Sequence, residues 1–329
     1  MNDVEKLVAF NNVRSYLNDN DQKELFKKLN LNEENLNTRL RGFNVETEFF
    51  LILHSLESCK DILSFDEGTS VLTNSYTPDT CLILKNDEKI FVEIKSKEDF
   101  QYKISGGNLQ KRIDFADSFG FKLFFAVKLK SFWGLYSSDY LKSKNGKLNF
   151  PDDYNNSEFE NVFDSKLIVL PKGIKIESYY SKTKDHLAGI HVPKYGNLFM
   201  YKFYFEDKLI LDVNKENEHE AVYSIALEAL HDEISKQSHE VKDLGNGETL
   251  VTEKLINNIF LYDYNFLLAH IYHTQSELGY IHVTTSFYKN IISQKGEKPI
   301  SKEILSYILS DLEQRGVPIT ISTLKDVNQ

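Results

Sequence analysis

The sequence is poor in cysteine, proline and methionine, with 2 Cys, 6 Pro and 2 Met among 329 residues. Cys59 and Cys81 are too few for a disulfide framework and lack the Cys-x-x-Cys spacing of a zinc site. Strongly apolar runs such as Phe49–Leu53 stop at five residues, whereas a membrane-spanning helix needs about 20. The start, MNDVEKLVAF, has no basic segment followed by an apolar one, as a secretory signal would. We therefore expect a soluble, cytoplasmic protein with no membrane partner.

Positive charge is also scarce, because 39 Lys and Arg stand against 49 Asp and Glu, giving a net charge of −10. This balance argues against a protein that coats nucleic acid by bulk electrostatics. The segment 79–147 differs, since it holds 13 Lys and Arg against 9 Asp and Glu, a balance of +4. A locally basic segment in an acidic chain predicts a confined site for a polyanion.

Several familiar motifs are absent. There is no GxxxxGK[ST] phosphate loop, so nucleotide hydrolysis is not predicted. The closely spaced pair His270 and His273 has no third metal ligand nearby in the sequence. No internal repeat or low-complexity tract is present. The chemistry must therefore come from another set of residues.

Hydrophobic spacing predicts helices first and strands later. Helices are expected before residue 41 and, after a break at Gly42, from Asn44 to about residue 58. From about residue 71 the apolar period changes to two. The elements expected from there are a hairpin over 80–84 and 89–95, a helix over 108–118 ended by Gly120, and strands over 121–129 and 133–136.

This order predicts an α/β fold with N-terminal helices and a second, α+β domain. The expected parts are a helical extension (1–40), an α/β domain (41–148), a linker dense in Asn, Asp and Ser (149–165) and the α+β domain (166–329). In that last domain we expect strands over 167–170, 174–180 and 198–213, and helices over 216–238 and 250–276.

One group of charged residues combines features of a catalytic site. Asp79 follows Pro78 at the start of one hairpin strand, and Glu93 and Lys95 lie near the end of the next. Both strand ends meet at the open end of the hairpin. An odd-numbered loop places Asp79, Glu93 and Lys95 on one face, whereas an even-numbered loop separates them. The sequence does not fix the loop length.

Two adjacent carboxylates repel each other, and a hard divalent cation such as Mg²⁺ can neutralise them. Such an ion activates water and stabilises charge on a phosphate, which is the chemistry of phosphodiester hydrolysis. Lys95 would orient or deprotonate that water, or bind the transition-state oxygen. Glu46, on the preceding helix, would point toward the sheet and serve as a further metal ligand. Glu48 is the alternative to Glu46, but it points with another face of the helix.

These residues resemble the PD-(D/E)xK nuclease superfamily, also called the restriction-endonuclease-like fold, and within it the archaeal Holliday junction resolvases. The likeness covers about residues 41–140. The matching positions are Gly42 with Glu46, Pro78-Asp79, Glu93-Ile94-Lys95, Phe115-Ala116-Asp117-Ser118-Phe119-Gly120, Ala126-Val127-Lys128 and Trp133.

The resemblance implies a mixed sheet flanked by helices and a DNA endonuclease that depends on Mg²⁺, with Mn²⁺ able to substitute. Glu46, Asp79, Glu93 and Lys95 would be its catalytic residues, with Asp79, Glu93 and Glu46 as metal ligands. Gln110 and Lys111, at the start of the following helix, would lie near the phosphate, although a solvated helix face explains them equally well. A homodimer acting on DNA is expected, with RNA left open.

Three alternatives remain at this point. The enzyme could be structure-specific, like a junction resolvase, or act in restriction or defence. The chain could instead be a nucleic-acid-binding or assembly module that keeps the nuclease fold without turnover. An even-numbered hairpin loop would instead indicate an α/β domain whose charged residues only face solvent and which has no nucleic-acid role. In every nuclease reading, residues 166–329 would supply specificity, dimerisation or partner binding.

Overall fold

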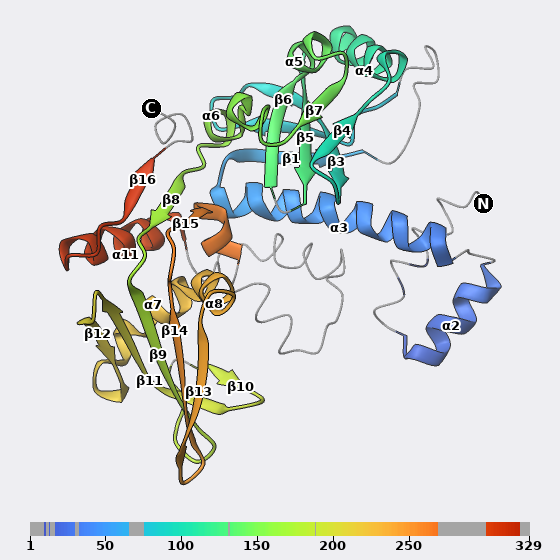
Figure 1. Ribbon diagram of the computed structural model, residues 1–329. Coiled ribbons are helices and arrows are strands. Elements are labelled where there is room, and N and C mark those ends of the chain that lie inside the picture. Colours follow the sequence, from blue (N-terminus) through green and yellow to red (C-terminus); the bar gives the residue numbers. More distant parts are fainter. Residues whose placement is uncertain are drawn as a thin grey trace. The chain divides into compact units, whose positions relative to one another are not determined.

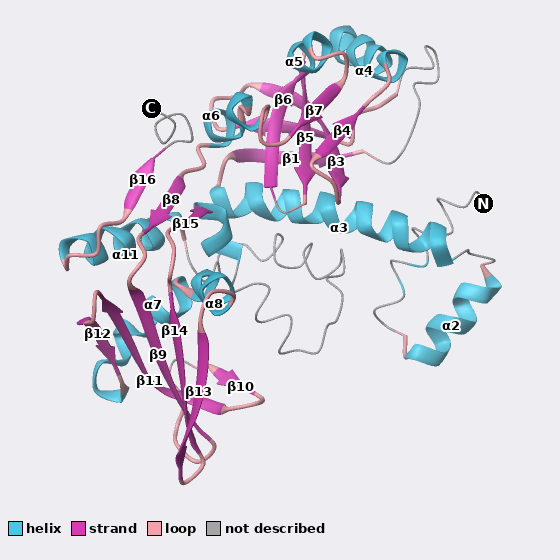
Figure 2. Ribbon diagram, viewed as in Figure 1, coloured by secondary structure: helices cyan, strands magenta, loops and turns pink. Residues whose placement is uncertain are grey.

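The computed structural model describes residues 10, 13, 17–29, 33–65, 76–130, 132–187, 189–268 and 301–322. They divide into two compact units, the first ending at Asp164 and the second beginning at Ser165. Among these residues, no helix is both long and apolar enough to cross a membrane. Figures 1 and 2 show the helices and strands of both units.

A five-stranded mixed sheet forms the centre of the first unit (Figure 1). The central strands β3 and β5 run parallel, and the other neighbours pair antiparallel. The sheet confirms the predicted α/β fold with a mixed sheet between helices. In sheet order the strands are β1 (Cys59–Ser64), β2 (Thr80–Leu84), β3 (Lys89–Lys97), β5 (Lys122–Leu129) and β6 (Phe132–Ser137).

Helices cover both faces of this sheet because side chains along β3 alternate between two cores. Phe91 lies in a core with residues of α4 (Gly106–Phe119) and α5 (Ser138–Ser143). Buried Ile90, Val92 and Ile94 point to the other face, and α3 (Glu33–Leu56) contacts β3. The two remaining elements of the α4 side are the short strands β4 (Gln101–Lys103) and β7 (Lys147–Asn149), which pair with each other.

Two predicted helix boundaries differ in outcome. The helix break at Gly42 is wrong, because α3 runs without interruption from Glu33 to Leu56, after the short helix α2 (Asp19–Lys28). A single glycine lowers the stability of a helix by only about 1 kcal/mol, and the neighbouring turns can offset this loss. The end at Gly120 is confirmed: Gly120 adopts a left-handed conformation with φ of 69° and closes α4.

The segment 149–165, predicted as a linker, is folded. It contains the 3₁₀ turn η1 (Tyr154–Asn156) and the helix α6 (Phe159–Phe163), whose two terminal phenylalanines are buried. Phe163 packs edge-on against Phe49 of α3, with ring centres 5.8 Å apart. Because polar residues of this segment face outward while two rings enter the core, composition alone misses the packing. We therefore propose Asp164, rather than residue 148, as the end of the nuclease-like unit.

The second unit is built on antiparallel sheets, in keeping with the predicted α+β class (Figure 2). The strands expected over 167–170, 174–180 and 198–213 are present as β8, β9, β11 and β12. The helix expected over 250–276 is wrong up to residue 262, since that stretch ends β14 and then forms β15. The part of it from 269 onward lies outside the described residues.

The elements of this unit are as follows. The six-stranded sheet contains β10 (His191–Val192), β11 (Gly196–Phe205), β9 (Ile174–Ser181), β14 (Glu248–Lys254) and β13 (His239–Gly245), with β12 (Lys208–Val213) paired to β11. The three-stranded sheet contains β15 (Ile259–Tyr262), β8 (Leu167–Leu170) and β16 (Thr320–Ser322). The helices are η2 (Lys215–Ala221), α7 (Val222–Ala226), α8 (Glu228–Ser235) and α11 (Lys302–Gln314).

Candidate active site

The register of the β2–β3 hairpin brings the predicted acidic residues together. Thr80 lies opposite Val92, so the preceding residue, Asp79, aligns with Glu93. The last pair, Ile83 and Lys89, encloses five residues, which is the odd-numbered loop that the shared face requires. Residues directly opposite one another share a face of a sheet, and Lys95 shares it with Glu93 because it lies two positions further along β3.

The three side chains converge through short contacts. Lys95 Nζ lies 2.7 Å from Glu93 Oε1 and 3.3 Å from Asp79 Oδ2. The backbone N–H of Ile94 donates a hydrogen bond of 2.6 Å to Asp79 Oδ2, which fixes that carboxylate beside the strand. One ammonium therefore lies between two carboxylates at the open end of the hairpin.

A second cation, which the sequence did not point to, completes the group. Arg112 extends from α4, and its Nη2 lies 2.7 Å from Glu93 Oε1. It follows Leu109 by three residues and precedes buried Ala116 by four, so this helical spacing was the available signal. The predicted pair behaves differently: Gln110 donates to Asp114 and Lys111 lies 4.9 Å from the ring centre of Tyr76. Both predicted residues are exposed.

The side chains of the site are largely buried. The Glu93 side chain is fully buried, and those of Asp79 and Lys95 are 20% and 34% exposed. Burial raises the pKa of Asp79 above its usual range, and the charge of Glu93 adds to this, while the Lys95 ammonium opposes it. Burial alone would lower the pKa of Lys95, but Asp79 and Glu93 outweigh it and hold that pKa above its usual value.

The donor set fits a hard divalent cation. Among the described residues, buried Glu93 Oε2 accepts no hydrogen bond, although Oε1 faces two cations. Such an atom costs free energy unless it finds a partner. Two aligned carboxylates, one with an unused oxygen, match the one or two that Mg²⁺ typically takes from a protein. Asp79 and Glu93 could hold such an ion together.

Glu46 is not brought into this group. Within the described part of the chain, no three His, Cys, Asp or Glu side chains lie close enough to hold one metal ion. Glu46 belongs to α3, which packs on the Ile90 and Val92 side of β3, while Glu93 points to the α4 side. A catalytic or ligand role for Glu46 stays a prediction.

Glu48, the alternative to Glu46, has a structural role. Its carboxylate accepts hydrogen bonds of 2.6 and 2.7 Å from Lys128 Nζ and one of 3.0 Å from Trp133 Nε1. Lys128 and Trp133 are paired across β5 and β6. Glu48 thus ties α3 to β5 and β6.

We expect Glu46→Gln and Glu48→Gln to affect different properties, cleavage in the first case and stability in the second. Glu48→Gln removes a partly buried charge pair and destabilises the first unit by roughly 1–3 kcal/mol, since Lys128 loses its counter-charge. Glu46→Gln tests the predicted ligand role and should reduce phosphodiester cleavage. Thermal unfolding and cleavage rates of the two purified variants separate the effects. Loss of cleavage in a stable Glu48→Gln protein would reverse the assignment of the two residues.

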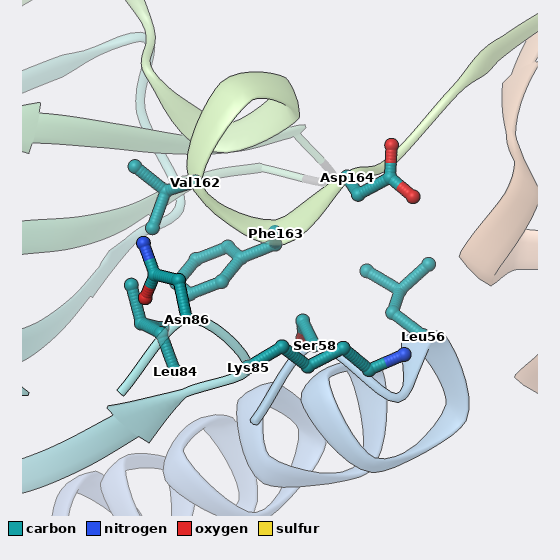
Figure 3. A pocket seen from close by; sticks show the side chains of 8 residues that line it. All are labelled: Leu56, Ser58, Leu84, Lys85, Asn86, Val162, Phe163 and Asp164. Carbon is teal, nitrogen blue, oxygen red and sulfur yellow. The ribbon is translucent and has the colours of Figure 1, made fainter. Parts of the chain in front are cut away.

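A cavity of about 210 Å³ lies at the other end of the hairpin (Figure 3). Its lining includes Lys85 and Asn86 of the β2–β3 turn, while Asp79 and Glu93 are at the open end. The candidate site is thus not part of this cavity. The other lining residues are Leu56, Ser58, Leu84, Val162, Phe163 and Asp164.

Comparison with known proteins shows which family the first unit is similar to. Residues 39–166 match the family described as archaeal Holliday junction resolvase (Hjc). Among solved structures, the Holliday junction resolvase Hjc of the archaeal hyperthermophile Archaeoglobus fulgidus is 19% identical and has a TM-score of 0.29. That match covers 34% of this chain and 92% of the resolvase chain. No curated protein matches. The family match confirms the predicted resemblance: residues 39–166 form a PD-(D/E)xK nuclease-like domain similar to the archaeal Holliday junction resolvases.

Proposed function

We propose that this chain is a divalent-metal-dependent endonuclease that hydrolyses phosphodiester bonds in DNA. The observation that carries the proposal is the convergence of Asp79, Glu93 and Lys95 at one end of the β2–β3 hairpin. If these two carboxylates and the ammonium only faced solvent, they would not lie in partly and fully buried positions, because burying unpaired charge costs free energy. The match to the resolvase family supports the same conclusion.

The protein groups have separate roles in this reaction. Asp79 and Glu93 would hold Mg²⁺, or Mn²⁺ in its place, whereas the predicted role of Glu46 as a further ligand is left to the Glu46→Gln variant to test. The bound cation supplies activation of the attacking water and stabilisation of negative charge on the phosphate. Lys95, between the two carboxylates, donates to a phosphate oxygen as charge develops there. Arg112 fixes the orientation of Glu93 by holding its Oε1.

Branched DNA is the substrate class we favour, with a specific duplex sequence as the restriction-type alternative. The segment 79–147 carries a balance of only +4, so a single nuclease-like unit neutralises few phosphates. We infer that residues 166–329 provide the remaining selection, and that a cytoplasmic homodimer presents two sites to two strands. Gln110 and Lys111, exposed on α4 near Arg112, would contact the backbone of the DNA.

A cleavage panel tests the function and the role of the second unit. The purified chain and residues 1–164 are each given four-way junction, fork, duplex and single-stranded DNA, and RNA, with Mg²⁺ or with EDTA. We expect cleavage only with Mg²⁺, a preference for junction or specific duplex in the full chain, and loss of that preference in residues 1–164. Cleavage that persists in EDTA contradicts the metal requirement. Equal preferences of the two proteins contradict a selecting role for residues 166–329.

A non-catalytic DNA-binding module is the second candidate, and one contact favours it. Glu93 Oε1 already lies 2.7 Å from both Lys95 and Arg112, so the charge of Glu93 is balanced without a metal ion. DNA binding by the full chain, with no cleavage of any substrate in Mg²⁺ or Mn²⁺, would establish this alternative in place of the enzyme.

A further inference from the structure

Three phenylalanine rings form a partly exposed stack in the first unit. The Phe132 and Phe150 ring centres are 4.6 Å apart and nearly parallel, at 17°, and those of Phe100 and Phe150 are 5.6 Å apart at 19°. Tyr154 packs edge-on against Phe132 and Phe150. Phe100 and Phe132, the outer members, are 40% and 42% exposed. We call Phe100, Phe132 and Phe150 the aromatic stack.

The aromatic stack adjoins the catalytic end of β3. Phe100 follows this strand by three residues, and the N–H of Phe150 donates to the Phe100 carbonyl. The turn before Phe132 is fixed to β3 as well, since Lys130 N–H donates to Lys97 O. Lys97 lies two residues beyond Lys95, about 7 Å along an extended strand. A nucleic acid at the candidate active site would therefore reach the stack within a few nucleotides.

Among the described residues, two lysines beside the stack have no acidic partner. Lys97 ends β3 three residues before Phe100, and Lys130 precedes Phe132 by two residues. Both lysines are exposed. Their ammonium groups are therefore available to an anion.

One of these two lysines covers a ring of the stack. Lys130 Nζ lies 3.9 Å from the ring centre of Phe100, a cation–π contact. The acidic residues beside the stack are Glu98, Asp99, Asp152 and Asp153; Asp152 accepts a hydrogen bond from Asn149, and Asp153 pairs with Lys144. Stacked, exposed rings with lysines on their margin are the arrangement that binds unpaired nucleobases, because bases stack on aromatic faces while the ammonium groups contact phosphates. A purely apolar protein partner would not need the two lysines.

We propose that the aromatic stack receives an unpaired base of the DNA next to the cleaved phosphate, with Lys97 and Lys130 binding the adjoining phosphates. Phe100 and Phe132 then act as substrate-recognition residues that bind an unstacked base beside the cleaved phosphate, while the choice among junction, fork and specific duplex stays with residues 166–329. This inference rests on the proposed nuclease function and adds to it the DNA feature that the first unit recognises.

The test uses the full chain in Ca²⁺, with a fluorescent 2-aminopurine at the branch point of a four-way junction. Base stacking on a ring quenches this probe, and titration gives the affinity. We expect quenching with the unchanged protein, and its loss in Phe132→Ala and Phe100→Ala with affinity weaker by roughly 5- to 100-fold, the range for one base–aromatic stack. Phe132→Tyr, which keeps a ring, should restore both. Phe260→Ala is the control, since Phe260 is 54% exposed in the second unit.

The lysines have their own readout. Each of Lys97→Ala and Lys130→Ala should reduce the slope of log affinity against log salt by about 0.9, the value for one lost phosphate contact. An unchanged slope in both variants would overturn the phosphate role.

Other results separate this inference from the proposed function. Undiminished quenching and affinity in the two alanine variants, while the unchanged chain still cleaves in Mg²⁺, overturns the stacking role and leaves the nuclease intact. Absence of both binding and cleavage overturns the two together. If the alanine variants instead change only the sedimentation of the free protein, the stack is a contact between two copies and the DNA proposal is wrong.

Discussion

Asp79→Asn and Lys95→Ala should each reduce cleavage by at least roughly 10²–10³-fold, the loss that follows removal of one preorganised charge-stabilising group. Asn keeps the size of Asp79 and still accepts from the Ile94 N–H, so only the charge is lost. Because burial and Glu93 both disfavour the ionised Asp79, this change should not lower the unfolding midpoint. Lys95→Ala leaves Arg112 paired with Glu93, which limits its effect on stability.

The measurement is a single-turnover cleavage rate in Mg²⁺, beside a thermal unfolding curve for each variant. Lys89→Ala is the matched control, because Lys89 is an exposed lysine of the same strand. It lies six positions before Lys95, about 20 Å along β3. Lys89→Ala should cleave as the unchanged protein does. Full activity in either site variant, with its fold intact, would remove Asp79 or Lys95 from the site.

The core of the site was predictable from sequence because it depends on local geometry. Two short strands joined by a polar turn specify a hairpin, and alternation along a strand then assigns Glu93 and Lys95 to one face. What the sequence left open was the register, which the pairing of Thr80 with Val92 resolves in favour of the shared face. Arg112 was missed because its role arises where a helix packs on a sheet, a contact between residues far apart in the chain.

The incorrect helix predictions have a similar cause. Residues 248–262 have apolar positions that fit a helix about as well as a strand, and the outcome depends on pairing with distant partners. β14 pairs with β9, and β15 pairs with β8, each across some 70 to 90 residues of sequence. Tertiary pairing of this kind overrides local propensity. The continuous α3 shows the same effect at Gly42, since a single glycine ended the predicted helix but not the real one.

Truncation at residue 148 should destabilise the first unit severely, whereas truncation at residue 164 should not. Phe163 is fully buried, 5.8 Å from Phe49 and 5.1 Å from Phe159 between ring centres, and Phe49 in turn packs against Trp133. These rings fill the space between α3, α6 and β6. Loss of one fully buried Phe side chain costs about 3–5 kcal/mol, because a cavity remains. Residues 1–148 lose Phe159 and Phe163 together.

Within the full chain, Phe163→Ala isolates one of these contacts. We expect a loss of about 3–5 kcal/mol, which lowers the unfolding midpoint of the first unit by roughly 10 °C. Phe119→Ala is the control, since this ring on α4 is 55% exposed and its loss leaves little cavity. Denaturant unfolding of both variants, and of residues 1–148 beside residues 1–164, gives the comparison. If residues 1–148 unfold as cooperatively and at the same midpoint as residues 1–164, α6 is dispensable and the nuclease-like unit ends before it.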